Sequence, residues 1–233
     1  LYKAFKNTTR LQSQNKKLHS TLNKSLANYQ SKYNAGIKQF DDLDAFREKI
    51  KYTRAKSIIN IEKLLLQFET NFKKNGGEVF WADNAHDVEA LFQHIITQND
   101  ISAIKSKSMA TEEIELNDFL SKSGIKVTET DLGEYIVQLR NEKPSHITAP
   151  ALHLSKDEIA LLFHEKFEMN PDANAEEITS FARQILRKEF ISAEIGISGA
   201  NFLIADSGSI ALTENEGNAS LVTSWPKTHI VIA

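Results

Sequence analysis

From residue 77 onward, short apolar runs alternate with amphipathic helical segments, and this alternation limits the fold more than any other feature. Residues 103–109 and 125–130 have the length and side chains of strands. Helical patterns follow them over 111–124 and 133–139. Because parallel neighbouring strands need a crossover segment between them, this order favours a mostly parallel sheet with helices on both faces. We therefore predict an α/β fold, a three-layer Rossmann-like sandwich.

The same patterns predict the remaining elements of this part of the chain. Helices are expected over 85–98, 155–167 and 174–190. Further strands are expected over 77–82, 145–149, 220–225 and 228–233, with a hairpin over 201–214.

The first 40 residues have a helical pattern and a one-sided charge. Their apolar residues recur three, four and seven apart, and Gly36 is expected to end the helix. Eight of the 28 Lys and Arg residues lie there and no acid does, which leaves 20 bases against 31 acids in the rest. With no Arg cluster and no interleaved aromatic residues, we expect no nucleic-acid partner and favour docking on an acidic protein surface.

A second helix is expected to begin at Asp41–Asp44 and to end at Gly76–Gly77, a strong C-terminal signal. We therefore assign residues 1–40 to an N-terminal basic helical arm and residues 41–233 to the α/β domain. The apolar runs are too short to cross a bilayer, so no membrane insertion is expected, and we predict a cytoplasmic location. The chain has no cysteine, so it can hold no cysteine-ligated iron–sulfur cluster.

Several long motifs in fixed order suggest a family. They read KSKSMATEEIELN, ETDLGEYIVQL, PSHITAPALH, GISGANFLIADSGSI, NEGN and HIVIA. Together they closely resemble the LUD domain of lactate-utilisation protein B, the iron–sulfur subunit of a bacterial L-lactate oxidation system. The resemblance implies a NagB/RpiA/CoA-transferase-like fold with an N-terminal helical extension. It also implies two [4Fe–4S] clusters, which we expect only in a cysteine-bearing segment beyond residue 233.

The resemblance further implies a part in L-lactate oxidation to pyruvate, within an oxidoreductase complex for electron transport. We expect the domain to bind a small anionic ligand or to dock other lactate-utilisation subunits, with homo-oligomers left open. Two alternatives stay open: a CoA- or sugar-phosphate-acting enzyme of the same fold, and a non-catalytic scaffold. Whether the domain is itself an enzyme is undecided by the sequence.

Polar residues follow the predicted strands, where open α/β sheets bind their ligands. Lys107 and Ser108 lie where the first strand runs into a polar turn and could hold an anion, although Lys residues on a strand can simply face solvent. After the next strand, Asp131 and Glu134 are better explained as helix-capping residues, and Glu129 is the better functional candidate.

Four of the nine glycines lie within residues 196–218, where tight turns or close backbone approach are expected. Gly208 most simply closes a hairpin, while Gly196 and Gly199 lead into its first strand and allow close approach. Residues 214–218 loosely resemble the Ser-Glu-Asn-Gly motif of CoA transferases. That likeness makes Glu214 and Glu216 weak candidates for a nucleophile, although the segment also reads as a polar turn.

The carboxyl ends of the strands are therefore expected to form one pocket. It would be lined by Lys107, Glu129, Asn201, Ser207 and Glu216. The wider set of candidate ligand-binding residues adds Ser108, Gly208, Asn215 and Gly217. His146 and His153 have no third partner at metal-binding spacing, so we assign no metal site.

Overall fold

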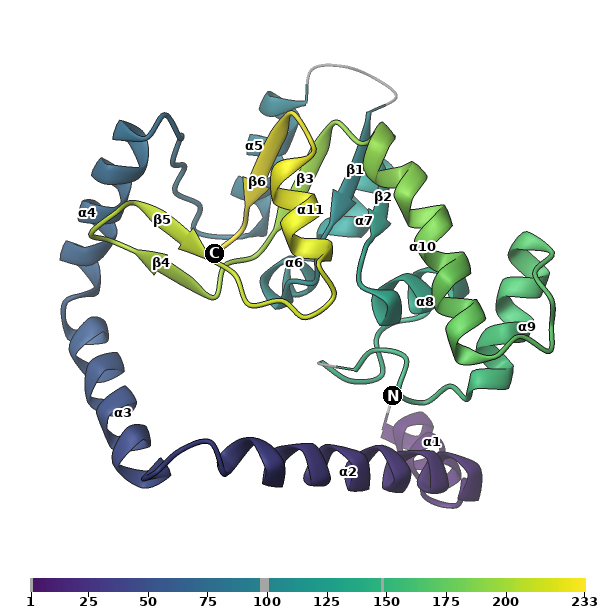
Figure 1. The fold of residues 1–233 in the computed structure, drawn as a ribbon. Helices are drawn as coiled ribbons and strands as arrows, with labels where there is room; N and C mark the ends of the chain where they lie inside the picture. Colours follow the sequence, from purple (N-terminus) through teal and green to yellow (C-terminus); the bar gives the residue numbers. More distant parts are fainter. Residues whose placement is uncertain (1, 97–100, 148) are drawn as a thin grey trace.

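A four-stranded parallel sheet forms the centre of the computed structural model, which describes residues 2–96, 101–147 and 149–233 (Figure 1). Its strand order is β2-β1-β3-β6. The strands are β1 (Ser102–Lys105), β2 (Lys126–Glu129), β3 (Ile195–Ser198) and β6 (Thr228–Val231). Helices cover both faces of this sheet, so the predicted three-layer α/β architecture is confirmed.

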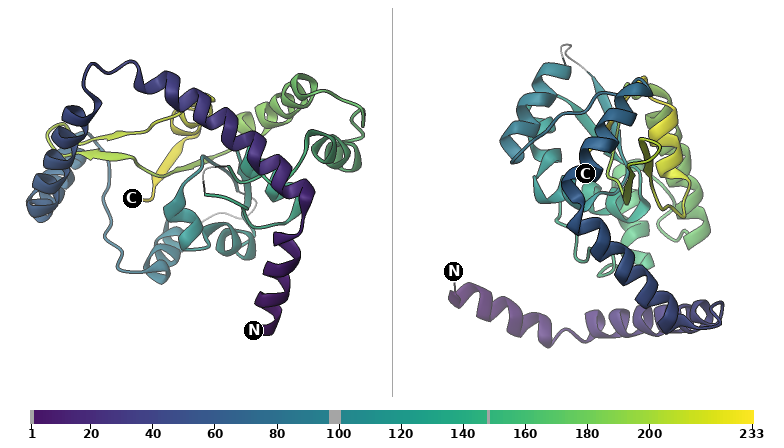
Figure 2. Two further views of the ribbon diagram at one scale, coloured as in Figure 1. Left: turned by 90° about the horizontal axis from the view of Figure 1, so that it is seen from below. Right: turned by 90° about the vertical axis from the view of Figure 1, so that its left-hand side faces the viewer.

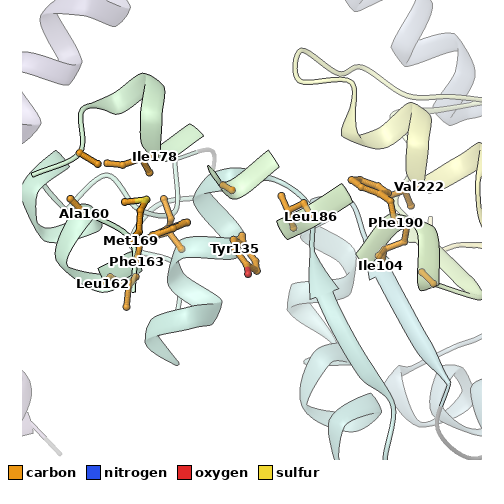
Figure 3. Close-up of a cluster of buried hydrophobic side chains, with 14 residues drawn as sticks. Ile104, Tyr135, Ala160, Leu162, Phe163, Met169, Ile178, Leu186, Phe190 and Val222 are labelled. Carbon is orange, nitrogen blue, oxygen red and sulfur yellow. The ribbon is translucent and has the colours of Figure 1, made fainter. Parts of the chain in front are cut away.

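Successive residues of β1 face opposite layers, as the pleat of a strand requires. Ala103 packs with α5 (Ala85–Ile95) and α7 (Leu116–Lys122). Ile104 faces the other side and belongs to a cluster formed by α8 (Leu132–Arg140), α9 (Lys156–Phe167), α10 (Ala175–Ser192) and α11 (Asn218–Ser224). Figure 3 shows this second cluster. In it the rings of Tyr135 and Phe163 pack edge to face, with their centroids 6.4 Å apart.

Several helices begin where the sequence places a capping residue. The side chains of Asp131, Ser155 and Asn174 accept hydrogen bonds from the first backbone N–H groups of α8, α9 and α10. The helix predicted over 111–124 is instead two helices, α6 (Met109–Glu113) and α7. The break lies at Glu115, whose backbone is left-handed with φ of 50°.

The strand predicted over 220–225 is wrong, because this segment lies in helix α11. Strands β3 and β6 are parallel neighbours, and their connection must cross over one face of the sheet. Helix α11 makes that crossing, and it buries Ala219 and Val222 against the sheet. Gly196 makes the close packing possible, since a Cβ atom there would lie 2.0 Å from the carbonyl oxygen of Val222.

Two other predicted strands are also absent. Residues 77–82 form no strand, and Phe80 and Trp81 stay exposed. The Trp81 indole donates to Glu69 of α4 (Ile61–Lys74). In 145–149, the described residues 145–147 and 149 form no strand, and residue 148 lies outside the described part. Conversely, residues 195–198 form β3, a buried central strand, where we had expected only a lead-in to the hairpin.

The predicted hairpin is confirmed as β4 (Phe202–Ile204) and β5 (Ser209–Ala211). Its tip packs against α4 (Ile61–Lys74), where Asn71 donates to the carbonyls of Ala205 and Asp206 at 2.9 and 3.0 Å. Gly208 has φ of +64° and lies against the backbone of Asn71, so a side chain at this position would collide with α4.

The N-terminal part is helical, but each predicted helix is divided into two. The first 40 residues contain α1 (Tyr2–Ser13) and α2 (Lys16–Ile37), and α3 (Leu43–Ile59) precedes α4 with a break at Asn60. Figure 2 shows that α1 and α2 stand away from the sheet domain. Within the described residues, no helix is long and apolar enough to cross a membrane.

Candidate functional site

The carboxyl ends of the central strands lie at a switch in chain direction. From β1 the chain passes to β2 on one side, and it later returns to β3 on the other side of β1. Ligands of open α/β sheets bind at such a switch point. Here the loops that leave β1 and β3 are in close contact, because a Cβ atom on Gly199 would lie 2.7 Å from Ser108 Oγ. Ser108 itself caps α6.

A buried charged cluster lies beneath α6 and α7. Lys105, at the end of β1, is fully buried, so the solvent-facing alternative for this lysine is wrong. Its ammonium lies 2.7 Å from Glu112 Oε1 and 2.9 Å from Glu129 Oε1. Glu129 sits opposite Lys105 in the β1–β2 register and also accepts a hydrogen bond of 2.6 Å from Asn117 Nδ2. These contacts fix Glu129 inside the domain, away from open solvent.

Burial and charge act against each other in this cluster. Burial raises the pKa of Glu129, although the adjacent Lys105 ammonium opposes the shift. For Lys105, burial favours the neutral amine, but Glu129 and Glu112 outweigh it and hold the pKa above its ordinary value. The second carboxylate oxygen of Glu129 is buried without a hydrogen-bond partner among the described residues. Lys105 and Glu129 are thus buried together, while the side chain of Glu112, 41% exposed, is the part of the cluster that reaches solvent.

A second cluster lies closer to the surface, around Lys107. Its ammonium is 2.7 Å from Glu134 Oε1, in the first turn of α8. Glu216 reaches the same place from the loop before α11, and its carboxylate accepts a hydrogen bond of 3.4 Å from the Leu132 backbone N–H. Burial, with the negative charge of Asp131, raises the pKa of Glu216. The positive charge of Lys107 is close enough to oppose this rise in the pKa of Glu216, so the two predicted site residues lie near each other.

A cleft opens beside this second cluster, between α10 and α11. Its cavity volume of about 710 Å³ lies in the range of small-molecule binding sites. Glu216, Asn215 and Asn218 line it from the loop and first turn of α11. Thr130, just after β2, and Leu132, the first residue of α8, line it from the other side. Apolar side chains complete the cleft: Ala182, Leu186, Phe190, Ile191, Leu221 and Trp225.

Two arginines of α10, Arg183 and Arg187, also line the cleft. They lie one helical turn apart, and within the described parts of the chain neither has an ion pair or a hydrogen bond. Paired guanidinium groups without acidic partners suit the binding of a carboxylate or phosphate. Neither arginine was among the candidates predicted from the sequence. Their spacing of four on an amphipathic helix was the signal available.

The loop residues proposed as nucleophiles have other contacts. Glu214 accepts hydrogen bonds from the backbone N–H and the hydroxyl of Ser220, and these bonds lower its pKa. Gly217 begins α11 with φ of +76°, a conformation that favours glycine. Both residues therefore shape the start of α11. Glu216 is the glutamate that faces the cleft.

The expectation of one pocket containing all five residues is wrong. Ser207 lies at the hairpin tip, where its carbonyl accepts from Asn75, the C-cap of α4, and Gly208 beside it contacts that helix. Asn201 closes the other end of the hairpin, since its side chain accepts a hydrogen bond of 2.7 Å from the Thr213 N–H. Glu129 is enclosed in the buried cluster. Because the hairpin tip packs on α4, Ser207 and Gly208 lie away from the loops at the carboxyl ends of the central strands.

The residues present do not fit an iron–sulfur cluster, because such clusters need cysteine thiolates and the chain has none. His153 is paired with Glu142 at 3.1 Å. In the parts of the chain that the structure describes, no three His, Cys, Asp or Glu residues gather as metal ligands would.

Fold and site together define an open α/β domain with a partly apolar, arginine-lined cleft between α10 and α11, one end of which lies at the carboxyl edge of the parallel sheet. The chain belongs to the LUD domain family, whose model matches residues 65–233.

Curated relatives share the name Lactate utilization protein B. The chain is 44% identical to the one from Bacillus pumilus over 191 residues, which cover 81% of this chain and 40% of the relative. The relative from Bacillus subtilis is 46% identical over 175 residues, which cover 74% of this chain and 36% of the relative. That from Lysinibacillus sphaericus is 40% identical over 221 residues, covering 94% and 46%. The chain thus spans less than half the length of these relatives. No solved structure matches it.

Proposed function

We propose that this LUD domain serves L-lactate oxidation to pyruvate by binding an organic anion in the cleft between α10 and α11. The observation that carries the proposal is the pair Arg183 and Arg187, whose guanidinium groups line the cleft without a protein partner in the described residues. The printed name of the relatives connects the family with lactate utilisation. We also propose that the domain binds other lactate-utilisation subunits. The [4Fe–4S] clusters would be held by cysteines in another part of a longer protein.

The cleft favours a carboxylate attached to an apolar group over a bare inorganic anion. Leu186 and Phe190 lie on the same helix as the two arginines, and Trp225, the C-cap of α11, lines the same cleft. An anion held by the guanidinium groups would therefore place its carbon skeleton against apolar side chains. Glu216 lies at the other side of the cleft and could accept a hydrogen bond from a hydroxyl group of the ligand.

The test is calorimetric titration of the full chain with L-lactate, pyruvate and inorganic phosphate. We expect the two organic acids to bind more tightly than phosphate, and Arg183→Gln or Arg187→Gln to weaken them by roughly tenfold each. Lys188→Gln is the matched control, because it removes the same charge from the same helix at a residue outside the cleft. Equal losses in all three variants, or no binding by the parent chain, would refute the proposal.

A further inference from the structure

Three apolar side chains on the walls of the cleft stay exposed. Ile191 of α10 is 58% exposed, Leu221 of α11 is 43% exposed, and Trp225, the C-cap of α11, is 56% exposed. None of them belongs to the two buried clusters that flank the sheet in the described part of the chain. Apolar side chains that gather around a concave site without joining the core mark a surface for binding.

The topology places these side chains toward one end of the cleft. Helix α10 leads into β3 and helix α11 leads into β6, and these two strands are parallel neighbours. The two helices therefore run in the same direction, opposite to the strands, as Figure 1 shows. Ile191 and Trp225, at the C-terminal ends of the helices, lie toward the amino ends of the strands. Asn215 and Glu216, before α11, lie at the opposite, polar end of the cleft.

The two arginines lie between these ends. The α10 residues that line the cleft run from Thr179 to Ile191, which is about 18 Å along the helix axis. Arg183 and Arg187 fall within this length, and Ile191 follows Arg187 by one further helical turn. The cleft thus has a polar end, an anion-binding middle and an apolar end.

Lactate is too small to use the apolar end. Its methyl group lies two bonds from its carboxylate carbon, so a lactate held by the arginines leaves Ile191 and Trp225 uncovered. The cavity volume of about 710 Å³ is in the range of sites for much larger small molecules. A branched or aromatic group in place of the methyl group would reach the apolar end. It would remove apolar surface of both ligand and cleft from water.

We propose that the cleft binds 2-hydroxy acids whose side group is larger than the methyl group of lactate, and that Trp225 and Ile191 determine this specificity. The carboxylate lies on Arg183 and Arg187, and the hydroxyl group donates to Glu216. The branched aliphatic or aromatic side group packs against the indole of Trp225, whose ring suits stacking as well as apolar contact. This inference rests on the proposed function, because it takes the arginines as the groups that hold the carboxylate.

Calorimetric titration of the full chain with acids that share one head group tests the proposal. L-lactate, L-2-hydroxybutyrate, L-2-hydroxyisocaproate and L-3-phenyllactate differ only in the side group. Each buried methylene group is worth roughly a factor of four in affinity, so we expect phenyllactate to bind at least about tenfold more tightly than lactate. Equal affinities along the series, with lactate binding still dependent on Arg183 and Arg187, overturn this inference alone. No binding of any acid overturns the proposed function as well.

Substitutions at the apolar end test which residues set the preference. The ratio of the affinities for phenyllactate and lactate should fall to roughly threefold or less in Trp225→Ala, and to an intermediate value in Ile191→Ala. Trp81→Ala is the matched control, since Trp81 is 59% exposed and lies outside the cleft, and its ratio should equal that of the parent chain. A ratio that Trp225→Ala and Ile191→Ala leave unchanged overturns the proposal. Circular dichroism of each variant checks that the fold is retained.

Tryptophan fluorescence locates the bound side group, because the chain has only two tryptophans. In Trp81→Phe the emission comes from Trp225 alone, and L-2-hydroxyisocaproate should shift it to the blue as the isobutyl group covers the indole. In Trp225→Phe the same acid should leave the emission of Trp81 unchanged. Emission of Trp225 that does not respond to an acid shown to bind by calorimetry overturns the proposal.

Discussion

Replacing Lys105 by methionine should destabilise the domain by an amount that depends on pH. In the native fold the Lys105 ammonium, fully buried, lies 2.9 Å from a Glu129 carboxylate whose side chain is 3% exposed. Lys105→Met keeps most of the side-chain volume but leaves that carboxylate buried without its cation. Removing one partner of a buried ion pair costs about 3–5 kcal/mol in other proteins, because the remaining charge has lost both water and partner.

Protonation of Glu129 sets a ceiling on this loss. A carboxyl group with the ordinary pKa of 4.5 takes up a proton at pH 7 for about 3.4 kcal/mol, at 1.36 kcal/mol for each pH unit. If keeping the Glu129 carboxylate charged in the fold costs more than this, the carboxylate takes up a proton instead. We therefore expect the unfolding free energy to fall by about 3 kcal/mol at pH 7, and by about 1.4 kcal/mol at pH 5.5.

The direction of the pH dependence follows from the raised pKa. In the variant, burial without Lys105 raises the pKa of Glu129 in the folded state further above that of the unfolded chain. The stability that this group contributes is complete below its unfolded pKa and is lost as the pH rises through the folded value. The variant should therefore approach the parent chain in stability near pH 4.5 and fall behind it toward neutral pH.

Urea unfolding followed by circular dichroism at several pH values measures the difference. Lys126→Met on the adjacent strand is the matched control, since its ion pair with Glu189 is on the surface and should contribute less than about 1 kcal/mol. Lys105→Met combined with Glu129→Gln should regain most of the loss at pH 7. A loss that is equal at pH 5.5 and pH 7, or a double variant no better than the single one, would refute the reasoning.

Two further predictions concern a close contact and the loop glutamates. Gly196→Ala should lower the unfolding free energy by roughly 2 kcal/mol or more, because the added Cβ atom would collide with the Val222 carbonyl. The control Gly36→Ala should be neutral or slightly stabilising, because no atom lies within 4 Å of the added Cβ. Equal effects of the two substitutions in thermal unfolding would contradict the packing of α11. After incubation with acyl-CoA donors and trapping with hydroxylamine, mass spectrometry should find Glu214 and Glu216 unmodified. The Glu214 carboxylate already accepts hydrogen bonds from the backbone N–H and the hydroxyl of Ser220. An adduct at either glutamate would favour the CoA-transferase alternative.

Local features of the sequence determined the fold class and many element ends. The change from a helical to an alternating apolar pattern predicted the layered α/β sheet, because the side-chain periods of helix and strand differ. Asp131 was recognised as a capping residue because its side chain bonds within its own helix start. The tip of the hairpin was equally local, since Gly208 supplies a positive φ that few other residues adopt.

Only the tertiary structure decided which short apolar segments were strands and which charges were buried. The apolar pattern of residues 220–225 fits a strand as well as a helix. They are helical because β3 and β6 are parallel, so the segment between these strands crosses one face of the sheet as α11. Lys105 reads as a surface lysine until Glu129, from the neighbouring strand, is placed opposite it. Arg183 and Arg187 became site residues because α11 folds beside α10 and closes a cleft over them. Each outcome depends on contacts between distant segments, which the order of residues along the chain does not display.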